Sequence, residues 1–202
     1  LVYEFCDELL KEKLNISWSC PSGVRLDTLD LAMLRLMEKS GCHSLGVGVE
    51  FGSQRMHDLT NKHLTIEIIK EKISLFSKTG IKTPGFFMLG LPGETRAEII
   101  KTIKFAKSLN IQRAQFNNFM PLPGSELYRQ LKKRGLGKID YSHFFVHDIG
   151  FVPAGFTRKQ MKNLRRRAYL EFYLRPKILA GLAKEIISFR QGRCTFTATW
   201  RP

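Results

Sequence analysis

The stretch Gly85–Thr95, GFFMLGLPGET, runs from an apolar segment into a glycine-rich turn and then toward a helix. Its apolar residues, Phe86–Leu89, predict a strand covered on both faces, as strands of a parallel sheet are. Gly90 and Gly93 permit positive φ angles and a close approach of the backbone to a ligand. Thr95, with a glutamate three residues later, has the spacing of a capping box that starts a helix. Because α/β proteins bind their ligands at the carboxyl ends of strands, we expect a binding site at this turn.

The same succession of strand, turn and helix recurs along the chain. Strands are expected at residues 15–20, 44–50, 86–89 and 112–119, and helices after Asp27, Thr65, Thr95 and Ser125. The units follow one another at about 30–40 residues, the size of a βαβ step. This alternation predicts an α/β fold with a parallel sheet, either doubly wound or closed toward a barrel.

The first of these units carries two specific expectations. Pro21, in the run Pro-Ser-Gly, is expected to end the first strand. Asp27 is expected to cap the following helix, with Leu29, Met33 and Leu36 on its buried face.

The pattern changes in the last third of the chain. We therefore divide it into a partial barrel core, residues 1–135, and a basic, largely helical C-terminal extension, residues 136–202. Thr157 and Gln160 have capping-box spacing and predict a long helix that stops at Pro176 and then resumes.

The net charge of +15 belongs mainly to this extension. From residue 158 onward there are 12 Lys and Arg against 2 Asp and Glu, so the first 157 residues carry only +5. One interpretation is a nucleic-acid-binding module in which Tyr169, Phe172 and Tyr173 stack on bases between the arginines. The other is a helix that lies on the barrel with its arginines solvated, and it makes nucleic acid the less favoured partner.

The cysteines and the apolar segments limit the kind of protein. The four cysteines, Cys6, Cys20, Cys42 and Cys194, form no Cys-x-x-Cys pair, so we expect reduced thiols, a cytoplasmic protein and no metal ligand set. The chain contains no run of 18 apolar residues, so we expect no transmembrane segment. The chain starts at Leu1 within a helix-like stretch, so we interpret it as a fragment of a longer protein.

A parallel sheet would collect several candidate ligands at one rim. Glu50 and Ser53 follow the second strand, Lys62 lies shortly after it, and Met88 and Phe119 lie near the ends of two others. These types suit a small cofactor with hydroxyls, a charged end and a flat ring: Glu50 for a diol, Lys62 for a carboxylate or phosphate. In the alternative, Glu50 binds backbone N–H groups or Arg25, Lys62 is solvated, and the apolar pair is plain core. No catalytic residue is assigned.

Several linked motifs resemble the radical S-adenosylmethionine (radical SAM) superfamily. They are ISWSC, then HSLGVGVEFGS with Asn61-Lys62, then GFFMLGLPGET and FMPLPGSELY, which together span residues 15–134. The run Phe172-Tyr-Leu-Arg-Pro176 is similar to the extension of one subgroup. That subgroup has a cobalamin-binding domain ahead of the radical SAM core and includes cyclases and methyltransferases of tetrapyrroles, lipids and antibiotics.

The resemblance implies a partial barrel that binds S-adenosylmethionine against a 4Fe–4S cluster and generates a 5′-deoxyadenosyl radical. By the same resemblance Glu50 contacts the ribose hydroxyls, with Ser53 in the adjoining loop, and Lys62 contacts the methionyl carboxylate. Met88 and Gly90 face the adenine, and Phe119 lies on its other side. The substrate is expected to be a small molecule, and the reaction a methyl transfer, a cyclisation or a related modification.

The chain departs from the family pattern at its beginning. The motif Cys-x-x-x-Cys-x-x-Cys and the first two strands of the barrel are absent from it. We therefore expect about four βα units, no cluster and no activity in the chain alone, and a homodimer through the open sheet edge as one option. Methylthiotransferase-like and coproporphyrinogen-oxidase-like members of the superfamily remain as alternatives.

Overall fold

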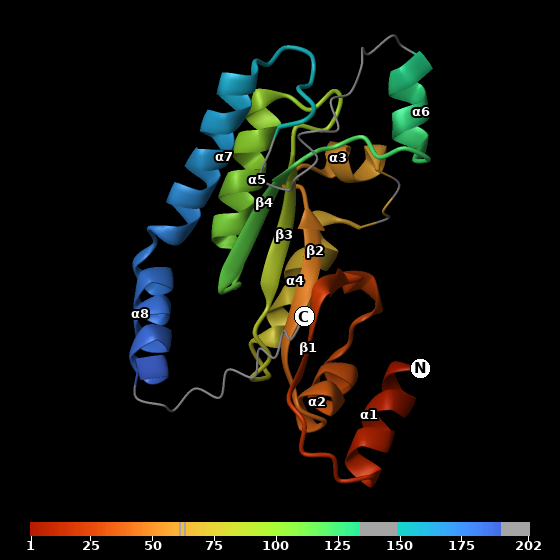
Figure 1. The fold of residues 1–202 in the computed structure, drawn as a ribbon, viewed down its shortest axis with the longest axis vertical. Coiled ribbons are helices and arrows are strands. Elements are labelled where there is room, and N and C mark those ends of the chain that lie inside the picture. The colour runs from red at the N-terminus through yellow and green to blue at the C-terminus, as the bar shows by residue number, and fades with distance from the viewer. Residues whose placement is uncertain (61, 63, 134–148, 191–202) are drawn as a thin grey trace.

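The computed structural model describes residues 1–60, 62, 64–133 and 149–190, and Figure 1 shows the order of the elements. In chain order they are α1 (Val2–Lys11), β1 (Trp18–Val24), the short 3-10 helix η1 (Leu26–Thr28), α2 (Leu31–Lys39), β2 (Cys42–Glu50), α3 (Gln54–Leu59), α4 (Ile66–Phe76), β3 (Pro84–Leu89), α5 (Arg96–Ser108), β4 (Arg113–Asn118), α6 (Glu126–Lys133), α7 (Arg158–Tyr173) and α8 (Pro176–Arg190).

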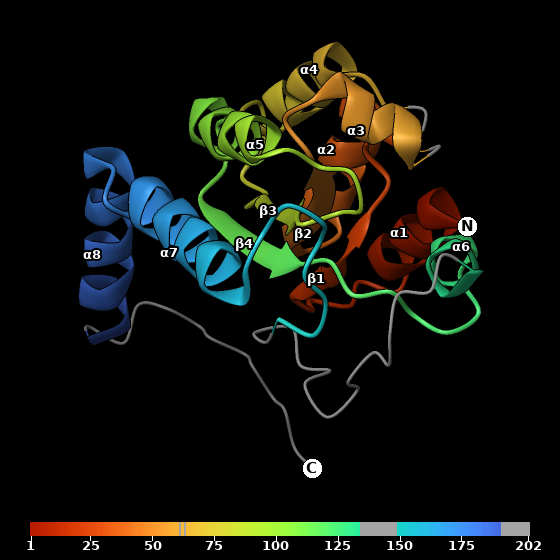
Figure 2. The same cartoon turned by 90° about the horizontal axis from the view of Figure 1, so that it is seen from above.

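The four strands form one open parallel sheet in the order β1-β2-β3-β4. Each strand lies beside the one that precedes it in the chain, as in a barrel, without the reversal of strand order that marks a doubly wound sheet. Seen from above, α2, α4 and α5 lie together on one side of the sheet (Figure 2). The prediction of a partial parallel barrel of about four βα units is therefore confirmed.

The central strand β3 is covered differently on its two faces. Phe87 and Leu89 are buried, whereas Phe86 and Met88 are only partly buried. The predicted cover is therefore complete on one face of the strand and only partial on the other. Helices cover the outer face, whereas among the described residues no other strand lies across from the inner face of the four-stranded arc.

Three predicted helix starts are confirmed by side-chain caps. The Thr65 hydroxyl accepts the Ile68 N–H, and Thr95 and Thr157 each form a full capping box with the side chain three residues later. Each cap satisfies backbone donors that would otherwise lack a partner in the first turn, so these helices begin where the sequence predicts.

The strand end and the helix cap expected for the first unit are both wrong. β1 does not end at Pro21 but continues to Val24, because β1 is an edge strand and needs no N–H at Pro21 on its open side. An irregular register after Cys20 takes up the distortion. Asp30, rather than Asp27, caps the helix through the Met33 N–H. Of the expected apolar face, Leu29 is buried, and Met33 and Leu36 pack partly buried against the core; Leu34 and Met37 are the buried residues of the helix itself. The intervening turn η1 buries Leu26 instead.

Two tyrosines of α7 close the opposite edge of the sheet. The Tyr173 hydroxyl bonds both the N–H (3.2 Å) and the C=O (3.0 Å) of Ala114 in β4. The Tyr169 hydroxyl contacts the same two groups of Phe116, at 3.2 and 3.5 Å. The side chains therefore occupy backbone groups that another strand would need, which protects this edge from pairing.

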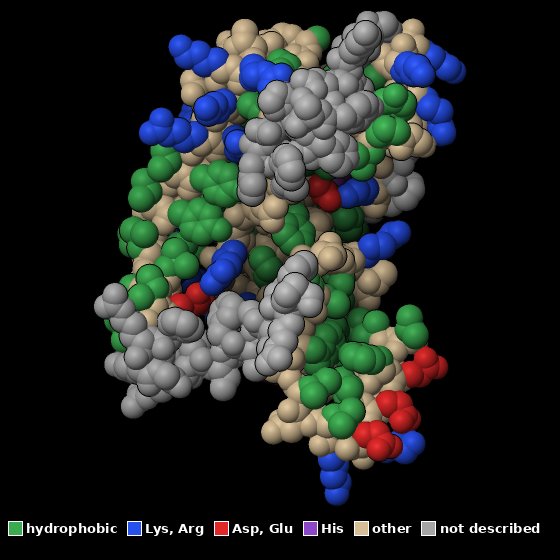
Figure 3. All heavy atoms as spheres, viewed as in Figure 1, with side chains coloured by type: hydrophobic (Ala, Val, Ile, Leu, Met, Phe, Trp, Pro, Cys, Tyr) green, Lys and Arg blue, Asp and Glu red, His purple; other side chains and the backbone are tan. Residues whose placement is uncertain are grey.

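The same contacts weaken the nucleic-acid alternative. Tyr169 and Tyr173 are bound to β4, and Phe172 is fully buried, so none of the three is free to stack on bases. Lysine and arginine side chains do gather over the upper part of the molecule, where α6 and α7 lie (Figure 3). The basic helix therefore lies on the barrel with much of its charge toward solvent.

Replacing both tyrosines by phenylalanine should destabilise the chain without changing its fold. Each substitution leaves a backbone N–H and C=O of β4 unpaired at a partly buried edge, at a cost of about 1–3 kcal/mol per site. Urea denaturation should show a lower midpoint for Tyr169→Phe/Tyr173→Phe than for the wild type. Tyr128→Phe, which removes a hydroxyl from α6 instead, serves as the control. An unchanged midpoint in the double variant would contradict this role.

The extension and the core share one hydrophobic cluster. Met161, Leu164, Ala168 and Phe172 of α7 are buried in the same cluster as the strands and α5. The described residues on the two sides of the predicted boundary at residue 135 therefore do not form two separate cores, and the domain boundary itself stays a prediction. β1 pairs only with β2 among the described residues, and a homodimer through this edge also stays a prediction.

The three described cysteines form no disulfide with one another, and Cys194 lies outside the described residues. Cys6 and Cys42 are buried, and burial raises the pKa of the Cys42 thiol to about 12. No described helix has the length and apolar character needed to cross a membrane.

Candidate functional site

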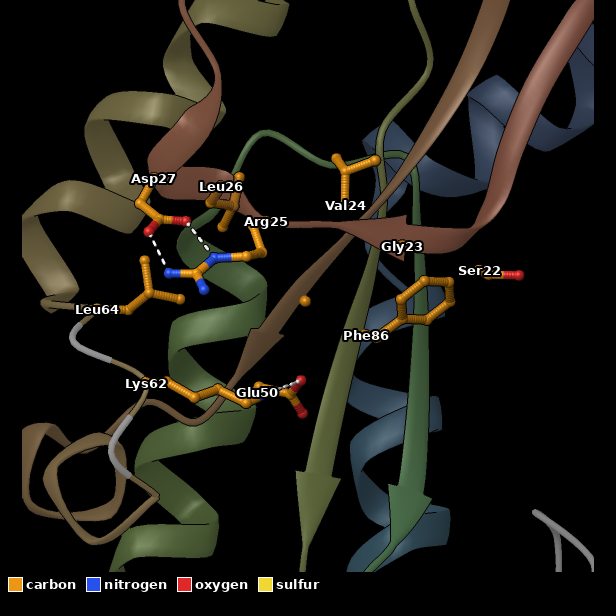
Figure 4. A pocket seen from close by; sticks show the side chains of 11 residues that line it. Ser22, Gly23, Val24, Arg25, Leu26, Asp27, Glu50, Lys62, Leu64 and Phe86 are labelled. Atoms are coloured by element: carbon orange, nitrogen blue, oxygen red, sulfur yellow. Dashed lines mark hydrogen bonds and ion pairs between the residues drawn. The ribbon is translucent and has the colours of Figure 1, made fainter. Parts of the chain in front are cut away.

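A cavity of about 370 Å³ opens at the carboxyl ends of β1 and β2 (Figure 4). Its charged residues are Arg25 and Asp27, which follow β1, Glu50, which ends β2, and Lys62, which follows β2. Phe86 and Leu64 supply apolar walls. The structure therefore brings Glu50 and Lys62, two of the predicted site residues, into one cavity.

The cavity exists because β2 carries glycine at alternate positions of its inner face. A Cβ at Gly46 would stand 2.8 Å from the Phe86 ring, and one at Gly48 would stand 3.0 Å from the Glu50 Oε1. The Phe86 ring therefore lies across the bare backbone of β2, and the Glu50 carboxylate turns back over Gly48. Side chains at these positions would fill the space that a ligand needs.

Glu50 adopts a backbone conformation that non-glycine residues seldom adopt. Its φ is +63°, and the register between β2 and β3 shifts between Gly48 and Glu50. A bulge at the end of a strand re-aims the side chain that follows it, and a left-handed non-glycine residue carries strain of order 1–3 kcal/mol. Such strain persists where the surrounding structure holds the residue in place, and it is frequent at binding sites.

Two ion pairs line the cavity side by side. The Lys62 ammonium lies 2.5 Å from the Glu50 carboxylate, and the Arg25 guanidinium binds both oxygens of Asp27, at 3.1 and 2.6 Å. Arg25 is thus committed to Asp27, and the alternative in which it pairs with Glu50 is wrong. The Glu50 side chain is 15% exposed and that of Lys62 is 43% exposed, so both can reach a ligand in the cavity.

The glycine turn after β3 is held from inside by Glu94. This side chain is buried, and its Oε2 accepts the N–H groups of Gly90 (2.6 Å) and Leu91 (3.2 Å). Gly90 has φ +84°, and a Cβ there would stand 2.6 Å from the Met161 methyl group. The turn therefore requires glycine at position 90 for two reasons, its backbone angle and the close contact with α7.

The Glu94 carboxyl should make the stability of the chain depend on pH in an unusual direction. Burial raises its pKa from 4.5 to about 7. Between these values the folded chain keeps a proton that the unfolded chain releases, so this group's contribution to the free energy of unfolding falls as pH rises. The fall amounts to up to about 3 kcal/mol over the window.

Glu94→Gln removes the titrating group and should flatten this part of the profile. Urea denaturation at pH 4.5 and pH 7.5 would measure the effect as the difference between wild type and variant. Neighbouring Glu98, whose pKa is lowered to about 2, is present in both proteins and cancels in the difference. Parallel profiles for the two proteins would contradict the prediction.

The other predicted site residues lie in neighbouring clusters. Phe119 is buried in an apolar cluster with Phe51 and Phe151, and Met88 packs against it. The Ser53 hydroxyl donates to Glu98 at 3.1 Å and is turned toward α5. The cavity that holds Glu50 does not include Ser53, Met88, Gly90 or Phe119. Their roles toward a cofactor stay predictions.

Sequence reasoning missed the two apolar walls, Phe86 and Leu64. A signal for Phe86 was present: β2 alternates Gly46 and Gly48 with valines, which indicates a bare inner face that a large side chain of the next strand can cover. Leu64 follows the loop after α3, and nothing in the local pattern indicates which way it turns.

The residues that line the cavity suit the polar groups of S-adenosylmethionine in their chemistry, whereas the described residues do not suit an iron–sulfur cluster. A carboxylate, an ammonium and apolar walls match a ribose diol, a carboxylate and an adenosyl group. The described residues contain no group of three His, Cys, Asp or Glu side chains that could hold a metal ion. Buried Cys6 and Cys42 are core residues.

Comparisons with known proteins agree on one family. The model of the radical SAM superfamily matches residues 2–106, more than half of the 202 residues. An uncharacterized methyltransferase of Pyrococcus horikoshii is 35% identical over 170 residues, which are 84% of this chain and 37% of that protein. The anaerobic magnesium-protoporphyrin IX monomethyl ester cyclase of Rubrivivax gelatinosus is 34% identical over 177 residues, 87% of this chain and 32% of the relative.

Solved structures share the fold. Coproporphyrinogen III oxidase of Escherichia coli, described as a radical SAM enzyme, superposes with a TM-score of 0.59 at 17% identity, over 86% of this chain and 37% of the other. A radical SAM methyltransferase of Kitasatospora setae, with cobalamin and a [4Fe-4S] cluster bound, gives 0.56 at 14% identity, over 79% and 33%.

These relatives include a methyltransferase and a tetrapyrrole cyclase, the two kinds of enzyme expected of the cobalamin-associated subgroup, so that resemblance is confirmed. The chain spans about a third of the length of the curated relatives it matches. With the parallel arc, the glycine turn and the Glu50–Lys62 cavity in place, the chain belongs to the radical SAM superfamily.

Proposed function

We propose that the chain forms the wall of an S-adenosylmethionine site that contacts the adenosyl group and the methionyl carboxylate. Glu50 accepts hydrogen bonds from the ribose hydroxyls, and Lys62 pairs with the carboxylate. The observation that carries the proposal is the strained, left-handed Glu50 paired with Lys62 inside the cavity. An ion pair at this position can exchange each partner for a polar group of a ligand without leaving a buried charge unpaired.

The remaining predicted residues would bind the base. Gly90 offers backbone groups at the turn, Met88 and Phe119 offer apolar contacts, and Ser53 supports the adjoining loop. Phe86 and Leu64, from the walls of the cavity, exclude water beside the ribose. In this superfamily the cofactor and a 4Fe–4S cluster together supply a radical that abstracts hydrogen from the substrate.

The whole protein is proposed to be a radical SAM enzyme of the cobalamin-associated subgroup. The matched part is about a third of its relatives, so the cluster-binding cysteines, two further strands and a cobalamin domain would lie in the rest of the polypeptide. The chain alone would then be inactive. Methyl transfer or cyclisation on a small molecule is the reaction class that the relatives' names suggest.

Two alternatives within the superfamily differ in what supports them. A coproporphyrinogen-oxidase-like enzyme shares the fold, with a TM-score of 0.59. A methylthiotransferase-like enzyme usually carries a small β-barrel after the core, whereas the described part of this extension consists of the helices α7 and α8.

The full-length polypeptide provides the test of enzymatic function. After anaerobic reconstitution with iron and sulfide, we expect 5′-deoxyadenosine from S-adenosylmethionine, and much less from Glu50→Ala. Glu126→Ala, which breaks an exposed ion pair in α6, should match the wild type. A full-length protein without a three-cysteine motif, or without 5′-deoxyadenosine formation, would contradict the proposed activity.

A further inference from the structure

Arg55 reaches from the loop after β2 to the glycine turn after β3. It lies at the start of α3, five residues after Glu50, and its Nη2 donates to the Gly93 carbonyl at 2.8 Å. The same guanidinium binds both oxygens of Glu98 in the first turn of α5, Nε at 2.8 Å and Nη2 at 2.6 Å. One side chain therefore joins three elements that follow the carboxyl ends of β2 and β3.

Besides Arg55, two further residues donate hydrogen bonds to the Glu98 carboxylate. Its Oε1 also accepts the Ser53 hydroxyl at 3.1 Å, and its Oε2 accepts the Thr95 N–H at 2.9 Å and hydroxyl at 2.8 Å. The Arg55 guanidinium, foremost among these donors, lowers the pKa of Glu98 to about 2. The carboxylate is thus a charged, nearly buried junction between the capping box of α5 and the loop that carries Ser53.

The backbone beside Arg55 is docked on α5 as closely as glycine permits. The Gly52 N–H donates to the Thr102 hydroxyl at 2.9 Å, and a Cβ at Gly52 would stand 2.6 Å from the Lys101 carbonyl oxygen. The loop after β2 is therefore held in one position against α5. Because Glu50 lies only two residues before Gly52, the packing of Gly52 on α5 also fixes the position of Glu50.

We propose that Arg55 is a positioning residue that fixes the separation between Glu50 and the Gly90–Gly93 turn. This inference rests on the proposed function, in which these two features bind the ribose and the adenine of one cofactor. A rigid nucleoside needs Glu50 and the Gly90–Gly93 turn at a fixed distance from each other. The contacts inside the cavity do not fix that distance, because the turn lies outside the cavity. Arg55 ties the two walls together directly, through Gly93, and indirectly, through Glu98.

The plainer interpretation is an ion pair that only adds stability. The Arg55 side chain is 52% exposed, and exposed ion pairs contribute little to stability. Arg167 provides a matched control, because it is 50% exposed, pairs with Glu171 within α7 and is not hydrogen-bonded to either wall in the described structure. The two interpretations therefore differ in ligand binding and in local motion of the turn rather than in overall stability.

The test compares Arg55→Ala, Arg55→Lys and Arg167→Ala in the 202-residue chain. Titration with S-adenosylhomocysteine should show binding weakened about tenfold in Arg55→Ala, because the two walls would no longer be held ready at the spacing that the ligand needs. Arg55→Lys keeps the charge but not the two-pronged geometry and should recover only part of the affinity. Arg167→Ala should stay within about twofold of the wild type.

Hydrogen exchange without ligand provides the second readout. The amides of Gly90 and Leu91, which Glu94 protects, should exchange faster in Arg55→Ala than in Arg167→Ala, with equal far-UV circular dichroism. Equal affinity and equal exchange in the two alanine variants would overturn the inference. Should the wild type fail to bind the probe, the proposed function fails, and the exchange rates alone decide whether Arg55 holds the turn.

Discussion

Glu50→Ala should weaken binding of S-adenosylmethionine about ten- to a hundredfold. The substitution removes the carboxylate that accepts hydrogen bonds from the ribose hydroxyls, and hydrogen bonds to a charged group contribute about 1.5–3 kcal/mol. It also leaves Lys62 without the partner that now lies at 2.5 Å. Isothermal titration at constant ionic strength would measure the loss.

Glu50→Gly separates binding from backbone strain. Glycine relieves the left-handed φ of +63°, so this variant should be more stable than Glu50→Ala by about 1 kcal/mol in urea denaturation. Both variants should bind equally poorly, because both lack the carboxylate. A glycine variant no more stable than the alanine variant would contradict the assignment of strain to this position, whatever the binding result.

Gly52→Ala should be strongly destabilising, although it adds only one methyl group to the chain. The new Cβ would stand 2.6 Å from the Lys101 carbonyl oxygen and 2.7 Å from the Thr102 Cα. Both are backbone atoms of α5 and cannot rotate away, so the loop after β2 must move away from α5. We expect a loss of about 3 kcal/mol, the upper end of the usual cost of overpacking, together with loss of cofactor binding.

Gly181→Ala is the matched control for this substitution. A Cβ at Gly181 in α8 meets nothing within 4 Å, and alanine is the better helix former. This variant should be at least as stable as the wild type. A Gly52→Ala protein that denatures at the same urea concentration as Gly181→Ala would show that the loop is not docked as described.

A feature of the structure is predicted most reliably from the sequence when neighbouring residues alone determine it. The positive φ angles at Gly90 and Gly93 and the capping box at Thr95 are each specified by the local residues, so they appear as expected. Pro21 misleads because its effect depends on the position of β1 in the sheet: at the edge its missing N–H costs nothing. Asp27 and Asp30 are equally good caps, and the burial of Leu26 decides between them.

The candidate site was predictable in part for the same reason. Glu50 and Lys62 belong to recognisable motifs, and the structure brings them together in one cavity. The joining of Arg55 to Glu98 spans 43 residues and depends on how closely the Gly52 loop approaches α5. No spacing rule within one element can reveal a contact between two elements of this kind.

Titration of the wild-type chain with S-adenosylmethionine tests the central claim most directly. ATP is the informative comparison, because a glycine turn at the start of a helix would also suit a phosphate. We expect saturable binding of S-adenosylmethionine, competition by S-adenosylhomocysteine, weaker binding in Glu50→Ala, and far weaker binding of ATP. Absence of binding, or ATP binding as strong as that of S-adenosylmethionine, would contradict the central claim.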